Sequence, residues 1–451
     1  MLSRVPVFAS LLTLLLATPA AAQQAPADPA PAGVSAEAFA QAGGAQTAPP
    51  QQVDELRRRL DALAAEVERL RSGEPEANAL TEERRRALGL APSAAATYRR
   101  ASEGISFAGY GEMLAENFAS ENEAGAGGAP TTRFDFVRAV LYTGYRFNDR
   151  FLFNSELEVE HGNEIFVEFA YVDYRATDNL SFRGGLLLIP LGLVNEFHEP
   201  TVYFGARRPE TEQRIIPSTW RENGGGVLGS FGMVNFRAYV TNGFNGAGFR
   251  SNGLRGGRQR GVQARAAHLA FSGRLDVTPI PGVFAGVGLY NGGSGQEQVV
   301  FNGTRLDMGT TVGEVHGQAQ FRGLDVRALY AHATVDDAGA ASRALASAGV
   351  TATSPIADAM QGGYVQVGYN VLSQASTETA VTPYLRYERV DTQHRVPAGF
   401  TRALAQDGTF TTLGVDVKPI PNVVIKTDYK WITNAAGTGR NQFNLNLGYA
   451  F

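Results

Sequence analysis

The stretch QFNLNLGYAF, residues 442–451, alternates large apolar residues with small or polar ones without a break. Neighbouring side chains of a strand point to opposite faces, so Phe443, Leu445, Leu447, Tyr449 and Phe451 share one face. Asparagine, glycine and alanine occupy the other face. A face this apolar has to meet a protein core or lipid.

Other segments show the same alternation with charged residues on the second face. Phe151, Phe153 and Leu157 alternate with Glu156 and Glu158, and a similar pattern places Lys426, Asp428 and Lys430 opposite apolar residues. Burying such charges in a sealed interior costs several kcal/mol each, so the space that they face should contain water. The apolar faces are therefore predicted to meet lipid.

The pattern of residues 105–451 predicts a succession of strands joined alternately by short and long connections. Sixteen strands are predicted, at 105–117, 133–147, 151–161, 164–175, 181–189, 219–229, 233–242, 262–275, 283–290, 312–322, 324–334, 361–371, 379–390, 409–418, 423–433 and 442–451. The fold class is all-β, a 16-stranded antiparallel transmembrane β-barrel with short periplasmic turns and long outer loops. Sixteen strands enclose more space than side chains can fill.

The first 104 residues have a different composition. Residues 1–22 have the layout of a signal peptide, with Arg4, a leucine-rich stretch and small residues before Gln23. Residues 23–50 form an Ala/Pro/Gln-rich linker, and 73–104 a second linker with a helix that Thr81 is expected to cap. Export implies a location in the bacterial outer membrane.

Residues 51–72 are predicted to form a short periplasmic α-helical coiled coil that trimerises the chain. Spacings of three and four residues place a set of aliphatic residues at its core: Val53, Leu56, Leu60, Leu63, Val67 and Leu70. Two alternatives stay open. The segment could form a single amphipathic helix on another surface, or bind the cell wall or a periplasmic partner while the barrel serves as its anchor.

Composition argues against several other functions. The chain has no cysteine, its net charge is −4, and no apolar run is long enough for a membrane-spanning helix. Nucleic acid is therefore not expected as a partner. The six histidines show no zinc-ligand spacing and no nucleophile motif appears, so no metal, cofactor or enzymatic activity is expected.

The stretch 191–226 resembles a known family. It contains Asn195–Pro200, the pair Arg207 and Arg208, and the run Ile-Pro-Ser-Thr-Trp-Arg-Glu at 216–222. These residues resemble the third-loop region of the phosphate-selective porins, which include polyphosphate and dicarboxylate channels. The resemblance implies a homotrimer in outer-membrane lipid, with loop 190–218 folded into each barrel and Arg207, Arg208, Arg214 and Arg221 at an anion-binding constriction.

Charge physics supports the same expectation, because arginines in a narrow passage attract anions and match phosphate or carboxylate. The alternative is that these arginines only pin the loop through Glu210, Glu212 and Glu222. The lumen is expected to carry mixed charges: Arg237, Arg274, Arg327, Arg386, Lys426 and Lys430 against Glu156, Glu158 and Glu160. Phe451 is expected to act as a C-terminal assembly signal.

The predicted function is passive diffusion of small hydrophilic solutes, with a preference for phosphate or small carboxylates. A weakly selective general porin and a barrel-anchored tether are the alternatives.

Overall fold

The computed structural model describes residues 80–99, 103–128, 131–349 and 354–451. The predicted signal peptide, first linker and coiled coil, including its core Val53–Leu70, lie outside the described residues. None of the described helices is long and apolar enough to cross a bilayer.

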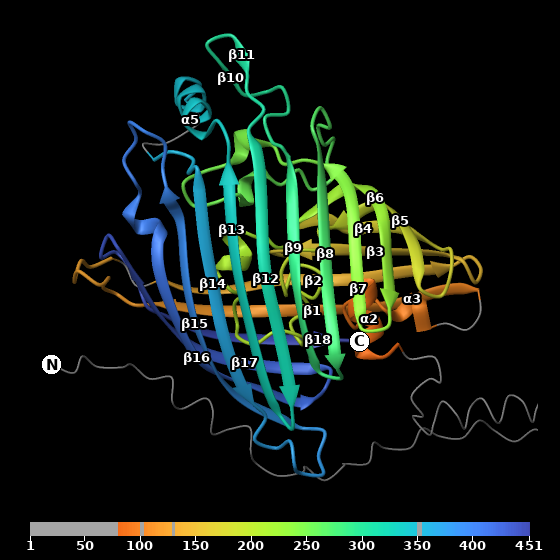
Figure 1. Ribbon diagram of the computed structural model, residues 1–451. Helices are drawn as coiled ribbons and strands as arrows, with labels where there is room; N and C mark the ends of the chain where they lie inside the picture. Colours follow the sequence, from red (N-terminus) through yellow and green to blue (C-terminus); the bar gives the residue numbers. More distant parts are fainter. Residues whose placement is uncertain (1–79, 100–102, 129–130, 350–353) are drawn as a thin grey trace, which may run out of the picture. The chain divides into compact units, whose positions relative to one another are not determined.

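Sixteen antiparallel strands close into one barrel, as predicted (Figure 1). They are β1 (Gly104–Phe118), β2 (Thr132–Arg146), β3 (Phe151–Glu160), β4 (Glu164–Arg175), β5 (Leu180–Leu188), β6 (Arg221–Phe231), β7 (Val234–Asn242), β8 (Leu269–Ile280), β9 (Val283–Gly293), β12 (Gly309–Phe321), β13 (Leu324–Val335), β14 (Ala359–Tyr369), β15 (Ala380–Arg395), β16 (Asp407–Ile420), β17 (Val423–Asn434) and β18 (Gln442–Ala450). The first and last strands form the seam, where Phe451 exchanges two backbone hydrogen bonds with Gly109.

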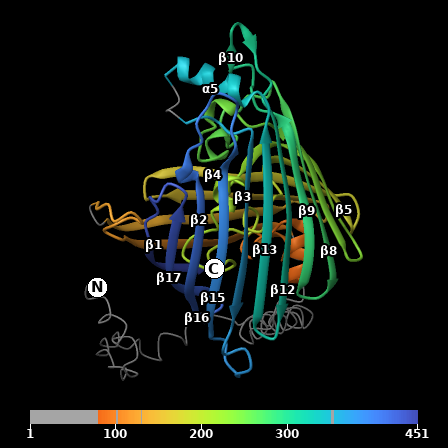
Figure 2. The same cartoon turned by 60° about the vertical axis from the view of Figure 1, so that its left-hand side comes forward.

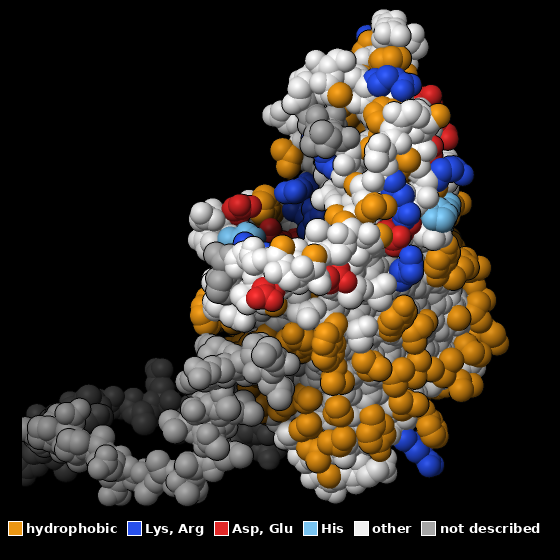
Figure 3. Space-filling view, turned by 90° about the vertical axis from the view of Figure 1, so that its left-hand side faces the viewer, with side chains coloured by type: hydrophobic (Ala, Val, Ile, Leu, Met, Phe, Trp, Pro, Cys, Tyr) orange, Lys and Arg blue, Asp and Glu red, His pale blue; other side chains and the backbone are white. Residues whose placement is uncertain are grey.

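The distribution of apolar and polar side chains in the barrel is the reverse of that in a soluble protein: apolar residues face outward and polar residues face inward. On β18, Leu445 is 44% exposed on the outside, whereas Asn446 is 1% exposed on the inside. The space-filling view shows an apolar belt on the outer wall, with charged side chains gathered beyond it and in a hollow (Figure 3). An outer wall of this kind suits contact with hydrocarbon.

The connections are short at one end of the barrel. Arg322 and Gly323 alone join β12 to β13, with φ of 47° and 88°. Two consecutive positive φ angles match the twist of a tight hairpin. The opposite end carries longer loops, which include α5 (Ala338–Ser347) and the hairpin of β10 (Val300–Phe301) and β11 (Thr304–Arg305) (Figures 1 and 2).

One predicted strand, 262–275, has the wrong bounds. The observed strand β8 begins at Leu269, because the side chain of Gln259 bonds to the carbonyl groups of Gly243 and Arg265 and holds residues 243–268 as a loop. It also continues to Ile280 through a register shift, which accommodates Pro279, a residue with no N–H to donate.

Residues 80–99 do not behave as a bare linker. Thr81 accepts a hydrogen bond from Arg84 N and begins α2 (Glu82–Leu88), and α3 (Ala96–Arg99) follows. The segment packs against an apolar patch on the inner wall, which comprises Tyr110, Tyr142, Phe169, Tyr171, Leu228 and Tyr239. The Thr81 cap and the helix after it agree with the prediction, whereas the packing of the segment against the inner wall was not predicted.

Candidate permeation site

Residues 189–220, which join β5 to β6, form a loop that we call the inward loop. Asn195 holds its two ends together: its amide donates to Ile189 O (2.7 Å) and Trp220 O (2.9 Å) and accepts from Trp220 N (2.7 Å). Trp220 stacks on Phe244 at 4.3 Å between ring centroids. The neck of the loop is therefore fixed at the barrel wall.

From this neck the loop extends to the opposite wall, so it lies inside the barrel (Figure 2). Inward-facing cations of the far strands bind its backbone carbonyl groups. Lys426 donates to Tyr203 O (2.7 Å), Lys418 to Thr201 O (2.7 Å) and Arg327 to Val202 O (3.0 Å). Many lumen cations are thus occupied in anchoring the loop.

Carboxylates of the far wall hold the tip of the loop. Glu388 accepts from Glu210 N (2.8 Å) and Thr211 N (2.6 Å), the start of the short helix α4 (Thr211–Arg214). Lys430 pairs with Glu210 at 2.5 Å, and Tyr364 donates to Glu212 at 2.6 Å. Burial alone would raise the pKa of Glu210. The neighbouring cations Lys430 and Arg214 outweigh burial and lower this pKa to about 2.

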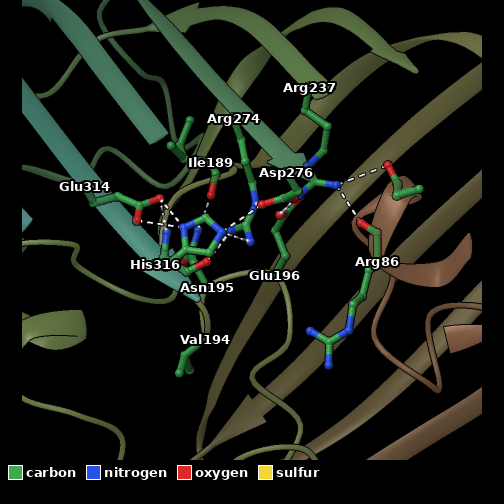
Figure 4. Close-up of polar contacts among 12 residues, drawn as sticks. Arg86, Ile189, Val194, Asn195, Glu196, Arg237, Arg274, Asp276, Glu314 and His316 are labelled. Carbon is green, nitrogen blue, oxygen red and sulfur yellow. Dashed lines mark hydrogen bonds and ion pairs between the residues drawn. The ribbon is translucent and has the colours of Figure 1, made fainter. Parts of the chain in front are cut away.

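A polar network joins the loop, the wall and the N-terminal segment (Figure 4). Arg237 donates to Arg86 O (2.6 Å) and pairs with Glu196 (3.1 Å) and Asp276 (3.4 Å). Figure 4 also shows Arg274 and His316 meeting at Asp276, at 2.7 Å each. The inward loop and the 80–99 segment are thus attached to the same wall residues.

Two cavities of at least about 230 Å³ lie beside the loop in the described part of the chain. The outer cavity, near the long-loop end, has a volume of about 230 Å³. Its charged lining residues are Glu112, Asp135, Arg138, Glu160, His161, Arg207, Arg208 and Arg255. The inner cavity, near the short turns, has a volume of about 550 Å³. Its charged lining residues are Glu82, Arg85, Arg86, Arg322, Asp325, Arg327, Asp416 and Lys418.

Tyr203 lines both cavities, so it marks the place where the loop separates them. Its hydroxyl donates to Glu112 at 3.2 Å, and Lys426 Nζ lies 3.8 Å from its ring centroid. Burial raises the pKa of Tyr203 above its ordinary value, so the phenol is neutral and keeps its proton for this hydrogen bond.

The predicted constriction arginines fall in different places. Arg207 and Arg208 line the outer cavity, where Arg207 pairs with Glu116. Arg214 pairs with Glu210 at 2.8 Å, and Arg221 with Glu168 at 3.5 Å. The structure thus brings two of the four to the cavity, and three of the four have a carboxylate partner.

The remaining lumen residues also have local partners. Arg138 pairs with Glu158 (2.8 Å) and Glu160 (3.4 Å), and Arg386 donates to Arg207 O (3.1 Å). Glu156 is fully buried and accepts from Tyr110 at 3.1 Å.

Sequence reasoning missed a group of arginines in the loop 243–268, which carries five arginines and no acidic residue. Among the described residues, Arg255, Arg258 and Arg260 form no ion pair with a carboxylate. Burial, and then repulsion from Arg255, Arg260 and Arg221, lowers the pKa of Arg258 to about 8. Burial, and then repulsion from Arg208 and Arg260, lowers that of Arg255 to about 10. The repulsion among these arginines indicates a locally positive field, although burial is the larger cause of both shifts.

This geometry, a sixteen-stranded barrel with a loop folded into its lumen, defines the porin fold. OmpF of Salmonella typhi, solved in complex with daunomycin, matches 77% of this chain and 98% of its own with a TM-score of 0.52 and 13% identity. OprB of Pseudomonas putida matches 77% and 94% with a TM-score of 0.51 and 12% identity. These neighbours are outer-membrane porins, and at this identity they establish the fold alone.

The sequence has a nearer relative. An uncharacterized protein of Aquifex aeolicus (strain VF5) is 35% identical over 359 residues, which cover 76% of this chain and 78% of that protein. The chain belongs to the same family as this Aquifex protein. No family model matches the sequence.

Proposed function

We propose that this protein is a porin of the bacterial outer membrane through which small hydrophilic solutes diffuse passively, with a preference for anions such as phosphate or small carboxylates. The porin fold and the apolar outer belt support the membrane location. The proposal includes a homotrimer, which the resemblance of residues 191–226 to the phosphate-selective porins implies.

The observation that carries the anion preference is the charge balance of the outer cavity. Its three acidic residues all have a basic partner: Glu112 and Glu160 share Arg138, which also pairs with Glu158, and Asp135 pairs with His161. Among the described residues, Arg208 and Arg255 form no ion pair, although both line the cavity. Their guanidinium groups offer the paired N–H donors that phosphate and carboxylate accept.

A weakly selective general porin is the second candidate. The observation in its favour is that Arg207, Arg214 and Arg221 each form an ion pair with a carboxylate of the protein. In this case the arginines would serve the loop rather than a solute, and selectivity would follow only from size.

Replacing Arg208 and Arg255 together by alanine separates the two candidates. The zero-current potential of single channels in planar bilayers, under a salt gradient, should move away from the anion side in this variant. The matched control is Arg305→Ala, since Arg305 lies on the exposed hairpin and pairs with Glu297. An unchanged potential in the double variant would favour the general porin.

A further inference from the structure

Three buried side chains from separate elements converge on one point inside the barrel. Glu156 comes from β3, Glu168 from β4 and His198 from the inward loop. All three are at most 1% exposed, and one potential ligand atom from each lies within 4.8 Å of the others.

The hydrogen bond at one ring nitrogen of His198 determines which tautomer is present. Nδ1 lies 2.8 Å from Asn195 O, and a carbonyl oxygen can only accept, so Nδ1 is assigned the proton. Nε2 then carries the lone pair in the neutral ring, and it has no hydrogen-bond partner. It faces Glu156 Oε1 at 3.6 Å and Glu168 Oε1 at 4.0 Å.

The two carboxylates also have unsatisfied oxygens. Neither oxygen of Glu168 accepts a hydrogen bond from an N–H or hydroxyl donor, although its side chain also meets the carboxyl group of Glu158, and the guanidinium of Arg221 lies 3.5 Å away. Glu156 accepts from Tyr110 through Oε1, and its Oε2 has no partner. The lone pair of His198 Nε2 and the two buried carboxylates repel one another unless a cation or a proton lies between them.

We propose that Glu156, Glu168 and His198 bind a divalent transition-metal ion of the Zn²⁺ type. Imidazole nitrogen and carboxylate oxygen bind Zn²⁺ at about 2.0–2.2 Å, which requires ligand atoms roughly 3.4 Å apart in a tetrahedron. The observed separations of 3.6 and 4.0 Å from Nε2 approach that value.

The surroundings also resemble those of a metal ligand set. A metal-bound histidine usually donates its other N–H to a carbonyl or carboxylate, as His198 does to Asn195 O. The imidazole favours a transition metal over Ca²⁺ or Mg²⁺, which take oxygen ligands. Two carboxylates neutralise the charge of the ion, and water would fill the fourth position.

The three ligands lie on three elements, so a bound ion would fasten the inward loop at His198 to the wall at β3 and β4. This role differs from the anion path proposed above, and it does not depend on conduction. The competing occupant is a proton on Nε2, which would make His198 an imidazolium between two carboxylates.

Metal binding can be measured on the folded barrel in detergent after treatment with a chelator. The probe is Zn²⁺ alone, titrated calorimetrically, and Co²⁺ as a replacement whose visible absorption reports the coordination. One equivalent should bind. His198→Gln and Glu168→Gln should each weaken binding at least about tenfold. His161→Gln is the control, since His161 also pairs with a carboxylate but is half-exposed.

Failure of the wild-type barrel to bind Zn²⁺ would overturn the proposal in favour of the imidazolium. Equal binding by wild-type and His198→Gln barrels would show that the ion binds elsewhere, and would overturn it as well. Heat-modifiable migration on SDS gels identifies folded barrels. If His198→Gln does not fold, Glu168→Gln provides the same comparison.

Discussion

At the scale of single residues, Tyr203 is the most informative side chain, because it separates the two cavities. Most of its neighbours in the loop hold the loop in place through backbone carbonyl groups, whereas its own ring lies between the spaces on either side. A solute that crosses the barrel through these cavities therefore has to pass Tyr203.

Tyr203→Ala should join the cavities and raise the single-channel conductance severalfold, since it removes the ring between them. Tyr203→Phe keeps the ring and loses only the hydrogen bond to Glu112, so its conductance should match that of the wild type. Recordings in planar bilayers provide the comparison. If Tyr203→Ala conducts like the wild type, the path runs elsewhere.

The raised pKa values of two carboxyl groups in the inward loop predict that the stability of the folded barrel depends on pH. Burial raises the pKa of Glu212 from 4.5 to about 7, although Tyr364 and Val194 N donate to it, and burial likewise raises that of Glu199 to about 7. A raised carboxyl pKa means that the folded state binds protons more tightly than the unfolded state. Stability should therefore be full below pH 4.5 and fall as the pH rises to 7.

Each group contributes up to about 3 kcal/mol over this interval. The loss of stability between pH 4.5 and 7 should shrink in Glu212→Gln, and should shrink further in the double variant with Glu199→Gln. Urea unfolding of the barrel, followed by tryptophan fluorescence, measures it. A wild-type stability that rises over this interval would contradict the assignment.

At the scale of the elements, the inward loop and the 80–99 segment share the lumen and bind each other. Ser93 donates to Glu199 through both its N–H (2.8 Å) and its hydroxyl (3.2 Å), and Arg237 contacts both elements. The free space in the barrel is therefore set by two inserted segments rather than by the strand count alone.

Deletion of residues 80–99 should raise the single-channel conductance, because it empties the part of the lumen in front of Tyr110, Tyr142 and Phe169. Deletion of the predicted linker 23–50 is the control, and it should leave the conductance of the barrel unchanged. Equal conductance in the two deletion variants would show that the N-terminal segment does not narrow the path.

The strands were predictable from the sequence, whereas contacts between residues of different elements were not. The period-two pattern predicted all sixteen strands, because one face of each meets an apolar medium and the pattern repeats wherever that holds. It could not predict the convergence of Glu156, Glu168 and His198, since they lie on three elements whose contact depends on barrel closure. The five arginines of loop 243–268 are visible in the sequence, but the approach of Arg255 to Arg208 is not.

At the scale of the whole molecule, the apolar residues lie outside and the charged residues inside, and most inner charges are paired or hold the loop. The unpaired charge is concentrated in the arginines near the outer cavity. The apolar belt suits contact with lipid, and in the proposed function the arginines near the outer cavity give the path its preference for anions.

The most direct test of the proposed function is the single-channel current of the purified wild-type barrel in a planar bilayer under a potassium chloride gradient. We expect stepwise insertions that pass current, with a zero-current potential displaced toward that of chloride. Folded barrels that insert and pass no current, or a potential displaced toward that of potassium, would contradict it.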